Sequence, residues 1–266
     1  MLKFLTLALS LLGAALAQNT PAQEEANKAV VLQLFKAAFQ QDNPETLSSF
    51  YDDQVQEHTA AGLQDKTSAL QGIAQLKSSA PGLVASIKHI AADGDLVAVH
   101  WQASSTPEDE FSGEARMDLY RVSAGKVIEH WSAHQRVPFS SASGNSLFSD
   151  LYVAPKDSPE ISEEQEEANK QLVIGSYAGL FNDLKMDLLD QNWDPNYLQH
   201  NPYVGNGLLP LKRLVGSLGP SGAGLKFVGV VADGDLVFVF SGGNSVQGDL
   251  FRVSDNKLSE HWDVLR

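Results

Sequence analysis

Four short motifs occur once in each half of the chain, in the same order, and this duplication is the strongest constraint on its fold. A repeat of more than about 100 residues is a whole domain, because the units of solenoid proteins have periods of about 20–50 residues. We therefore expect two domains of the same fold. The paired motifs are Glu-Glu-Ala-Asn-Lys at 24–28 and 166–170, His58 and His200, Ala-Asp-Gly-Asp-Leu-Val at 92–97 and 232–237, and Glu-His-Trp at 129–131 and 260–262.

The motifs place repeat 1 at 24–138 and repeat 2 at 166–266. The segment between them, 139–165, is rich in Ser, Gly, Pro and Asp, which is typical of a linker. This linker also contains Leu147 and Phe148, whose apolar side chains indicate that it lies against a protein surface.

The first residues have the pattern of a cleavable targeting segment. Lys3 gives a short positive start, residues 4–16 are almost unbroken in their apolar character, and residues 15–17 fit the small-residue rule for cleavage. The run is shorter than the roughly 20 apolar residues that cross a bilayer. We expect 1–17 to be a signal peptide, so that the mature protein is secreted or periplasmic and carries no membrane segment.

Charge and cysteine content exclude several classes of function. The formal net charge of −14 argues against nucleic acid as a partner, because phosphate binding needs a basic surface, and it disfavours anionic membranes equally. The chain has no cysteine, so disulfides, thiolate catalysis and zinc–sulfur sites are excluded.

Each repeat begins with helices. Apolar residues recur at helical spacing over 29–39 and over 172–181, which predicts the opening helix of each repeat. Pro44 suits the first turn of a short second helix that continues through Phe50 and Tyr51. A third helix is predicted at 67–79, before Pro81-Gly82, and its counterpart in repeat 2 at 209–218.

The rest of each repeat has the pattern of antiparallel strands joined by Asp-Gly and Gly turns. Helices followed by a meander of strands predict an α+β fold. The expected strands are 84–90, 96–103, 116–122 and 127–133 in repeat 1, and 225–231, 236–240, 249–253 and 258–264 in repeat 2.

The strand at 96–101 is largely apolar on both faces, with Val97, Val99 and Trp101 on one and Ala98 and His100 on the other. A strand with one solvated face would alternate apolar and polar residues. We therefore expect helices on one side of each sheet and the sheet of the other repeat on its other side. This arrangement is an intramolecular pseudo-dimer.

Several motifs together resemble the SnoaL-like polyketide cyclase family of the nuclear transport factor 2-like superfamily. They are Tyr-Leu-Gln-His-Asn-Pro at 197–202, Ala-Asp-Gly-Asp-Leu-Val at 232–237, Asp-Leu-Phe-Arg-Val at 249–253 and Glu-His-Trp-Asp-Val at 260–264. The resemblance implies two tandem cone-shaped domains, each with about three helices wrapped on a curved antiparallel sheet around an apolar pocket. It also implies an intramolecular aldol condensation without metal or organic cofactor, although the superfamily includes binding modules without catalysis.

Asp118 and Asp249 occupy the family-like position at the start of the fourth strand. A carboxylate whose pKa is raised by an apolar pocket can hold and return a proton near neutral pH. The alternative is a solvated aspartate or one paired with Arg116. His100 lies one strand from Asp118, and if both face the cavity they form an acid/base pair or orient an enolate oxygen. The alternative for His100 is a core histidine, as the counterpart Phe240 suggests.

Two further pairs are ligand-binding candidates. His58 and His200 are expected near the mouth of each cone, where they contact ligand or bind a loop carbonyl. Tyr51 and Trp193 occupy matching positions near the second helix and are expected in the core or the pocket wall.

The Glu-His-Trp motifs place His130 and His261 on the face of the last strand opposite the tryptophans. We expect the tryptophans in the core and the histidines at the contact between the sheets, with His261 also a ligand-binding candidate. His130 and His134 are separated by about 13 Å along a strand, too far to share one ion. We therefore expect no metal and no cofactor.

The resulting hypothesis is a secreted tandem SnoaL-like protein that binds a small hydrophobic molecule. As an enzyme it would be a cofactor-independent acid/base catalyst, an aldol-type cyclase, lyase or isomerase acting on a small hydrophobic carbonyl compound. Asp118 would remove a proton next to the carbonyl, and His100 or His58 would stabilise the enolate. The alternatives are a non-catalytic module that binds a small apolar ligand, and an interaction protein whose pockets are filled by side chains.

Overall fold

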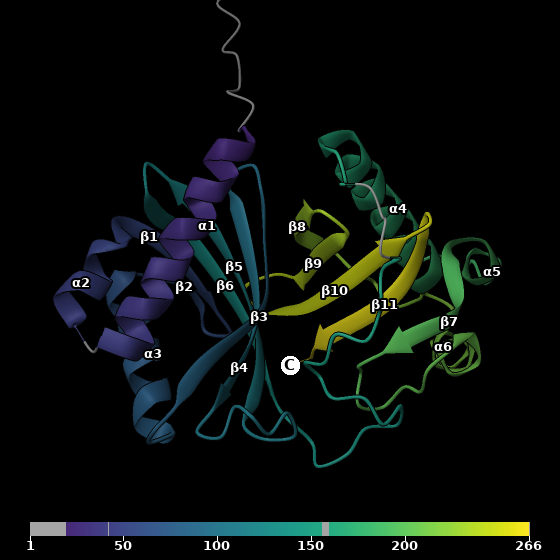
Figure 1. The fold of residues 1–266 in the computed structure, drawn as a ribbon, viewed down its shortest axis with the longest axis horizontal. Helices are drawn as coiled ribbons and strands as arrows, with labels where there is room; N and C mark the ends of the chain where they lie inside the picture. Colours follow the sequence, from purple (N-terminus) through teal and green to yellow (C-terminus); the bar gives the residue numbers. More distant parts are fainter. Residues whose placement is uncertain (1–19, 42, 156–159, 266) are drawn as a thin grey trace, which may run out of the picture.

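The structure is a computed structural model that describes residues 20–41, 43–155 and 160–265. The predicted signal peptide, 1–17, lies outside these residues. The described chain forms two β-sheets, each covered by helices on one side (Figure 1). This is the α+β class that the sequence predicts. Within the described ranges, no helix combines the length and apolar character needed to cross a membrane.

The first half contains three α-helices, a short π-helical extension of the first, and six strands. The side chains of Thr20, Asn43 and Asp65, each just before a helix, accept hydrogen bonds from backbone N–H groups of the first turn and so fix where each helix begins. The elements are α1 (Pro21–Lys36), η1 (Ala37–Gln41), α2 (Pro44–Ser49), β1 (Tyr51–Thr59), β2 (Gly62–Gln64), α3 (Lys66–Ser79), β3 (Val84–Asp93), β4 (Leu96–Ser104), β5 (Glu114–Ser123) and β6 (Lys126–Arg136).

The second half repeats this order without a counterpart of β2. Its sheet has the order β7-β11-β10-β9-β8, which matches the β1-β6-β5-β4-β3 part of the first sheet, β2-β1-β6-β5-β4-β3. The elements are α4 (Glu163–Phe181), α5 (Leu188–Asn192), β7 (Trp193–Gln199), α6 (Leu208–Gly216), β8 (Phe227–Asp233), β9 (Leu236–Gly242), β10 (Val246–Ser254) and β11 (Lys257–Val264).

Both sheets are mixed, whereas the sequence predicts purely antiparallel ones. β1 runs parallel to β6, and β7 runs parallel to β11. The pattern of alternating apolar residues missed β1 and β7 because both are dominated by polar side chains, with exposed residues in their middle. These strands form because the backbone of the neighbouring strand pairs with them, which is a tertiary effect that local propensity does not report.

The helix-covered face of each sheet has a core of its own. In the first half Val97, Val99 and Trp101 of β4 pack with residues of α1 and α3, and in the second half Val237 and Val239 of β9 pack with residues of α4 and α6. The two faces of β4 and β9 are thus buried in different cores, as their apolar character on both faces predicts.

The opposite faces of the two sheets share one buried cluster. Ala98, Met117 and Leu119 of the first sheet belong to the same cluster as Phe238 and Leu250 of the second. Leu147 and Phe148, from the segment between the halves, are buried in this cluster as well. The linker therefore contributes to the core between the sheets.

The repeated Glu-Glu-Ala-Asn-Lys and Asp-Gly motifs meet each other in the structure. Glu24 Oε1 accepts a bond from the Gly94 backbone N at 2.7 Å, and the Asn27 side chain donates to the Gly94 carbonyl at 3.0 Å. Lys28 Nζ lies 2.8 Å from Asp233 Oδ2 in the other half. The first helix thus binds the Asp-Gly turn of its own half and forms an ion pair with an aspartate of the other half.

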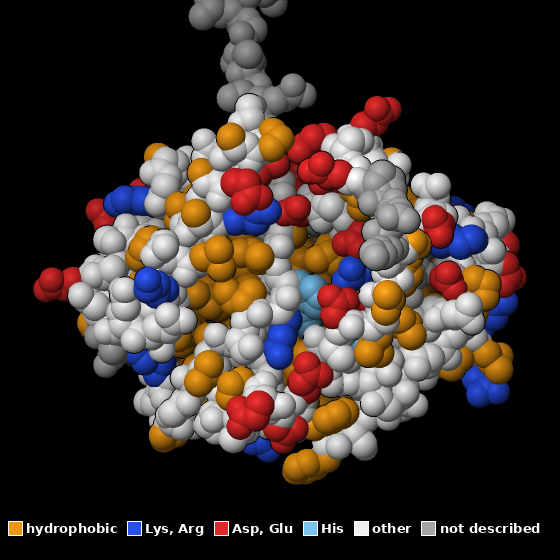
Figure 2. Space-filling view, viewed as in Figure 1, with side chains coloured by type: hydrophobic (Ala, Val, Ile, Leu, Met, Phe, Trp, Pro, Cys, Tyr) orange, Lys and Arg blue, Asp and Glu red, His pale blue; other side chains and the backbone are white. Residues whose placement is uncertain are grey.

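The second copy makes the same contacts in reverse. Glu166 and Asn169 bind the backbone of Gly234, and Lys170 Nζ lies 2.7 Å from Asp93 Oδ2. The motifs that reveal the duplication in the sequence are therefore the residues that join its two products. Acidic side chains gather along this edge of the molecule, where α1 and α4 begin (Figure 2).

Candidate functional site

Each half contains a cavity between its helices and its sheet. The cavity of the second half has a volume of about 320 Å³, and that of the first half about 120 Å³. Aromatic and aliphatic side chains from α4, α6 and β7 form most of the larger wall. This wall includes Tyr177, Phe181, Trp193, Tyr197, Tyr203, Leu211 and Phe251.

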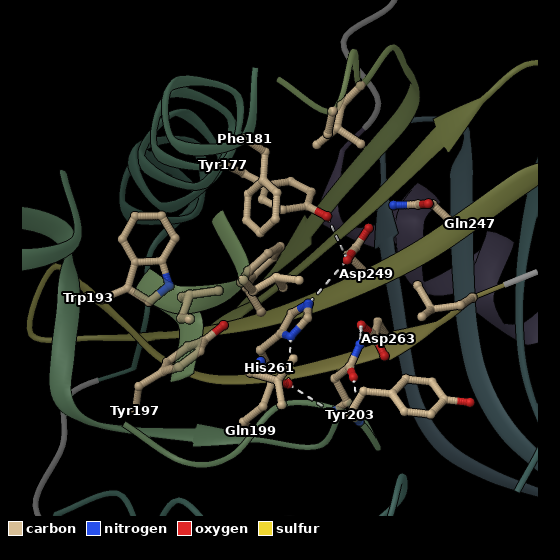
Figure 3. A pocket seen from close by; sticks show the side chains of 18 of the residues that line it. Tyr177, Phe181, Trp193, Tyr197, Gln199, Tyr203, Gln247, Asp249, His261 and Asp263 are labelled. Carbon is tan, nitrogen blue, oxygen red and sulfur yellow. Dashed lines mark hydrogen bonds and ion pairs between the residues drawn. The ribbon is translucent and has the colours of Figure 1, made fainter. Parts of the chain in front are cut away.

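Three titratable side chains lie together on the sheet side of the larger cavity (Figure 3). Asp249 on β10 pairs in register with Asp263 on β11, and His261 lies two residues before Asp263 on the same strand. Alternate residues of a strand point to one face, so the register alone brings these three side chains to the same side of the sheet. All three are buried.

The hydrogen bonds around His261 fix one proton and leave a second one shared. His261 Nδ1 lies 2.9 Å from Gln199 Oε1, which also accepts the backbone N–H of Asn201 at 2.8 Å. Because this oxygen is an acceptor, Nδ1 carries a proton. His261 Nε2 lies 3.2 Å from Asp249 Oδ1, and a hydrogen bond there needs a proton on one of the two atoms. Tyr177 donates to the same Asp249 oxygen at 2.9 Å.

Two carboxylate oxygens remain free at this site. Asp263 Oδ2 accepts a bond from the Asn201 side chain at 2.5 Å, but its Oδ1 has no hydrogen-bond partner among the described residues, and neither does Asp249 Oδ2. Burial raises the pKa of Asp263 to about 6, with the Asp249 carboxylate acting in the same direction and His261 opposing it. Buried polar atoms without a partner are rare and mark sites where a ligand or proton is expected.

The corresponding side chains of the first half are fully occupied by one another. Asp118 and His130 stand where Asp249 and His261 stand in the second half, with Ser132 in place of Asp263. Asp118 accepts bonds from the Trp101 indole N–H and, at 3.3 Å, from His130 Nε2. His130 Nδ1 lies 2.7 Å from Glu57 Oε2.

These contacts determine which side chains of the smaller cavity are charged. Burial alone would lower the pKa of His130, but the carboxylates of Glu57 and Asp118 outweigh it and raise that pKa to about 10. Burial would likewise raise the pKa of Asp118, but His130 and Arg116 outweigh it and lower the pKa. At neutral pH the first half therefore holds a closed ion pair.

Five of the residues selected from the sequence line the two cavities: Asp118 and Tyr51 in the first half, and Asp249, Trp193 and His261 in the second. The predicted pair of Asp118 and His100 does not form. Asp118 pairs in register with Val99, and His100 pairs with Met117, so the two side chains point to opposite faces of the sheet. His100 instead lies between the sheets, with its Nδ1 3.2 Å from His89 Nδ1.

His58 and His200 also lie on the side of the sheets away from the cavities. His58 stacks on Trp131, and His200 stacks on Trp262, with ring centroids 4.4 Å and 4.8 Å apart. Both tryptophans belong to the cluster shared by the two sheets. These histidines therefore do not line the two cavities, and His200 Nδ1 instead lies 2.5 Å from the Ser146 backbone carbonyl, which is the alternative that the sequence left open.

The placement of His130 and His261 at the contact between the sheets is wrong for the same reason. Because Trp131 and Trp262 face the other sheet, the histidines that precede them face the helices. The alternation of the last strand was correct, but the choice of which face meets the helices was inverted.

Four side chains that shape the larger cavity were not selected from the sequence as site residues: Tyr177, Gln199, Asn201 and Asp263. Gln199 is the last residue of β7, so recognition of this strand would have placed its side chain on the same face as that of Tyr197. Asp263 shares a face with His261, and this signal was present in the sequence.

Asp249, His261 and Asp263 form, within the described part of the chain, a group whose donor atoms could surround a metal ion, since they lie within 4.8 Å of one another. A cation there would displace the proton between His261 Nε2 and Asp249 Oδ1. His261 Nε2 and Asp249 Oδ1 can therefore bind either a shared proton or a cation, but not both.

Comparison with known proteins finds a family match in the first half. The sequence profile of the SnoaL-like domain family matches residues 31–130. Similar solved structures include IdmH, a candidate polyketide cyclase from Streptomyces antibioticus (22% identity, 41% of this chain and 91% of that chain, TM-score 0.36). A candidate polyketide cyclase from Sinorhizobium meliloti (17% identity, 39% and 93%, TM-score 0.33) is another.

A third similar structure is AclR, a candidate hydroxylase from Streptomyces galilaeus (18% identity, 43% and 82%, TM-score 0.38). No curated protein matches the chain. The similarity to the SnoaL-like domain family thus covers residues 31–130, and the second half of the chain repeats the strand order of the first.

Proposed function

We propose that the second repeat binds a small, mainly apolar organic molecule in its cavity, and that the first repeat stabilises it without binding a ligand of its own. The observation that carries this proposal is the difference between the cavities, about 320 Å³ against about 120 Å³. Ligand sites in proteins have volumes of about 300–1,000 Å³, apolar walls and a few converging polar groups. The larger cavity has these properties.

A difference at one matched position of the two repeats accompanies the difference in volume. Trp101 on β4 packs against Phe35 and Phe39 in the first half and donates its indole N–H to Asp118. The strand register places Ser241 at the matching position of β9, opposite Gln247, as Trp101 is opposite Arg116. The second repeat thus lacks both the bulk of the indole and the donor that would occupy Asp249 Oδ2.

Acid/base catalysis is the second candidate function, and the environments of Asp249 and Asp263 favour it. Asp263, whose pKa is raised by burial, suits a hydrogen-bond donor, and Asp249 Oδ2, which has no partner among the described residues, is placed to act as a base. Asp249 Oδ2 would take a proton from the carbon next to a carbonyl, and the protonated Asp263 would donate a hydrogen bond to the enolate oxygen. Asp249 would then return this proton to the substrate carbon. In the alternative, the enolate carbon would form a bond to a second carbonyl carbon of the same molecule, and the resulting alkoxide would take the proton from Asp249. The enzyme hypothesis thereby moves from Asp118 to Asp249.

The proposed ligand lies outside the cell if 1–17 acts as a signal peptide. Its short positive start, apolar run and small residues at 15–17 support secretion or periplasmic location of the protein.

The first test exchanges the residues at the two matching positions. We expect the neutral fluorescent probe phenylnaphthylamine to bind the wild-type chain at one molecule per chain. Ser241→Trp should lower its affinity at least about tenfold, because the indole and the probe cannot share one packed space. Trp101→Ser is the matched variant in the other repeat and should leave the site in the second repeat intact. Equal binding by Ser241→Trp and the wild type would place the ligand elsewhere.

Mass spectrometry of molecules that copurify with the protein then identifies the natural ligand class. If that ligand is a carbonyl compound, catalysis is separated from binding by NMR in deuterated water. The wild type should exchange the protons next to the carbonyl, and Asp249→Asn should bind the compound without exchanging them. Binding without exchange by the wild type supports the binding function alone.

A further inference from the structure

The two cavities differ in how their buried charges are balanced. In the first repeat the carboxylates of Glu57 and Asp118 are matched by two cations of the same cavity, His130 and Arg116. Buried charges are tolerated in proteins when partners of opposite charge lie beside them. The first repeat satisfies this condition with its own side chains.

The second repeat lacks this balance. The strand registers place Gln247 where the first repeat has Arg116, and Gln199 where it has Glu57. Asp263 stands in place of Ser132. None of the residues that line this cavity in the described part of the chain is a lysine or an arginine. Two carboxyl groups therefore face the cavity with a single histidine between them.

The unpaired atoms of the site have one chemical character. Asp249 Oδ2 and Asp263 Oδ1 are both buried without a partner, and the two residues are 2% and 4% exposed. Their other oxygens are already held by Tyr177 and Asn201. The free atoms are acceptors on residues that line the cavity, so they require a donor, and a positively charged donor satisfies them best.

We infer that the ligand of the second repeat carries a protonated amine on an apolar body, and that this ammonium group takes the place that Arg116 has in the first repeat. The ammonium group would donate to Asp249 Oδ2 and Asp263 Oδ1, while the apolar body fills the space that Trp101 occupies in the first repeat. This inference rests on the proposed binding of an organic molecule and not on the acid/base chemistry, which requires a protonated Asp263.

The walls of the cavity favour an organic ammonium ion over a bare metal ion. Tyr177, Phe181, Trp193, Tyr197 and Phe251 surround the space in front of the carboxylates. Aromatic faces attract organic cations, an interaction of about 0.5–2 kcal/mol.

A metal ion would use little of this aromatic surface. It would also have to break the contact of 3.2 Å between His261 Nε2 and Asp249 Oδ1, which an ammonium group leaves in place. The size of the cavity, about 320 Å³, likewise suits an organic molecule.

The test compares two probes of the same shape with the full-length chain. Naphthylmethylamine is a cation at about pH 7.5, and naphthylmethanol is its neutral counterpart. By isothermal titration calorimetry we expect the amine to bind at one molecule per chain and at least about tenfold more tightly than the alcohol, since hydrogen bonds to charged groups are the stronger ones. Increasing the salt concentration should lower the affinity for the amine and leave the affinity for the alcohol unchanged.

Two variants reduce the excess negative charge of the second cavity and should remove the preference for the amine. Gln247→Arg supplies an internal cation, and Asp263→Asn removes one negative charge with little change of shape. Each should lower the affinity for the amine at least about tenfold while the alcohol binds as before. Arg116→Gln, the matched change in the first repeat, should leave both affinities unaltered. Circular dichroism shows that each variant is folded before it is titrated.

Every outcome separates this inference from the proposed function. Equal affinity for the two probes overturns the inference and leaves the binding function standing. Failure of both probes to bind the wild type argues against the binding function itself. Binding of Zn²⁺, Mn²⁺ or Ca²⁺ alone at one ion per chain, lost in Asp263→Asn, would overturn the inference in favour of a metal site.

Discussion

At the scale of single residues, the two repeats show how few changes separate an open cavity from a filled one. Trp101 and Ser241 occupy matching positions, and the indole supplies both the bulk and the hydrogen bond that complete the first site. Glu57 and Gln199 also match, and the Glu57 carboxylate helps raise the pKa of His130, whereas the amide oxygen of Gln199 accepts a hydrogen bond from His261. A duplicated chain thus contains its own set of control substitutions.

His100 makes the stability of the fold depend on pH, because this histidine is buried without an acidic partner. Burial lowers its pKa well below the ordinary value, and neighbouring His89 acts in the same direction. The folded protein therefore keeps this ring neutral, whereas the unfolded chain takes up a proton below about pH 6.5. The contribution of His100 to stability is complete above about pH 6.5 and is lost as the pH falls.

We predict that His100→Phe, which introduces the residue found at the matching position 240, weakens this loss. Between about pH 6 and pH 5 the wild type should lose up to about 1.4 kcal/mol of unfolding free energy more than the variant, the value for one proton per pH unit. Urea denaturation at several pH values measures the difference. His134→Gln, at an exposed position, is the control and should follow the wild type. Parallel pH profiles for the wild type and His100→Phe would contradict the prediction.

At the scale of elements, β3 and β8 are edge strands of the two sheets. Each strand contributes an aspartate that accepts a hydrogen bond from the backbone of the other. Asp233 Oδ2 accepts the backbone N–H of Ala92 at 3.0 Å, and Asp93 Oδ2 accepts that of Ala232 at 3.2 Å. Unpaired edge N–H groups invite pairing with other chains. These aspartates accept hydrogen bonds from such N–H groups, and they thereby attach each sheet to the opposite half.

We predict that Asp233→Ala lowers the unfolding free energy by about 1–3 kcal/mol, because it leaves a buried N–H group without an acceptor. Lys28→Ala should cost less, about 0.2–1 kcal/mol, since it removes only a partly exposed ion pair. Urea denaturation gives both values, and hydrogen exchange at the Ala92 amide should accelerate only in Asp233→Ala. Asp183→Ala, which removes an exposed ion pair with Lys185, is the control. Equal costs for Asp233→Ala and Lys28→Ala would show that the backbone bond is unimportant.

At the scale of the whole molecule, the contact between the sheets is not symmetric, although it joins two copies of one fold. The strand registers place Met117 and Gly248 at matching positions of β5 and β10. A Cβ atom at Gly248 would lie 2.8 Å from both Cβ and Sδ of Met117. A large residue of one repeat thus fills the space left by a glycine of the other, which is possible only because the two copies diverged within one chain.

We predict that Gly248→Val lowers the unfolding free energy by about 1–3 kcal/mol through overpacking. Met117→Ala alone should cost about 2–5 kcal/mol by leaving a cavity. The double variant should cost less than the sum by more than about 0.5 kcal/mol, because the new valine occupies the vacated space. Urea denaturation of the wild type, the two single variants and the double variant gives the four free energies of this double-mutant cycle. Simple additivity would mean that the two residues do not pack against each other in solution.

Much of the fold follows from the sequence because its signals are local. The Asp-Gly turn before Asp95 and the alternation along 96–103 and 116–122 predict hairpins, and the repeated motifs predict that they occur twice. The alternation of residues along β10 and β11 also places Asp249 on one definite face of β10, and His261 with Asp263 together on one face of β11. These features depend on the period of a strand and the geometry of a turn, which a short segment determines by itself.

Other features appear only in the tertiary structure. Which face of a strand meets the helices is not written in its alternation, so His100 and His261 were each expected on the wrong side. The parallel strands β1 and β7 depend on the backbone of β6 and β11. The volume of each cavity depends on side chains from several elements at once. The sequence by itself determined two related α+β units, and packing between distant segments decided which unit has an open site, because space and charge balance are properties of the assembled fold.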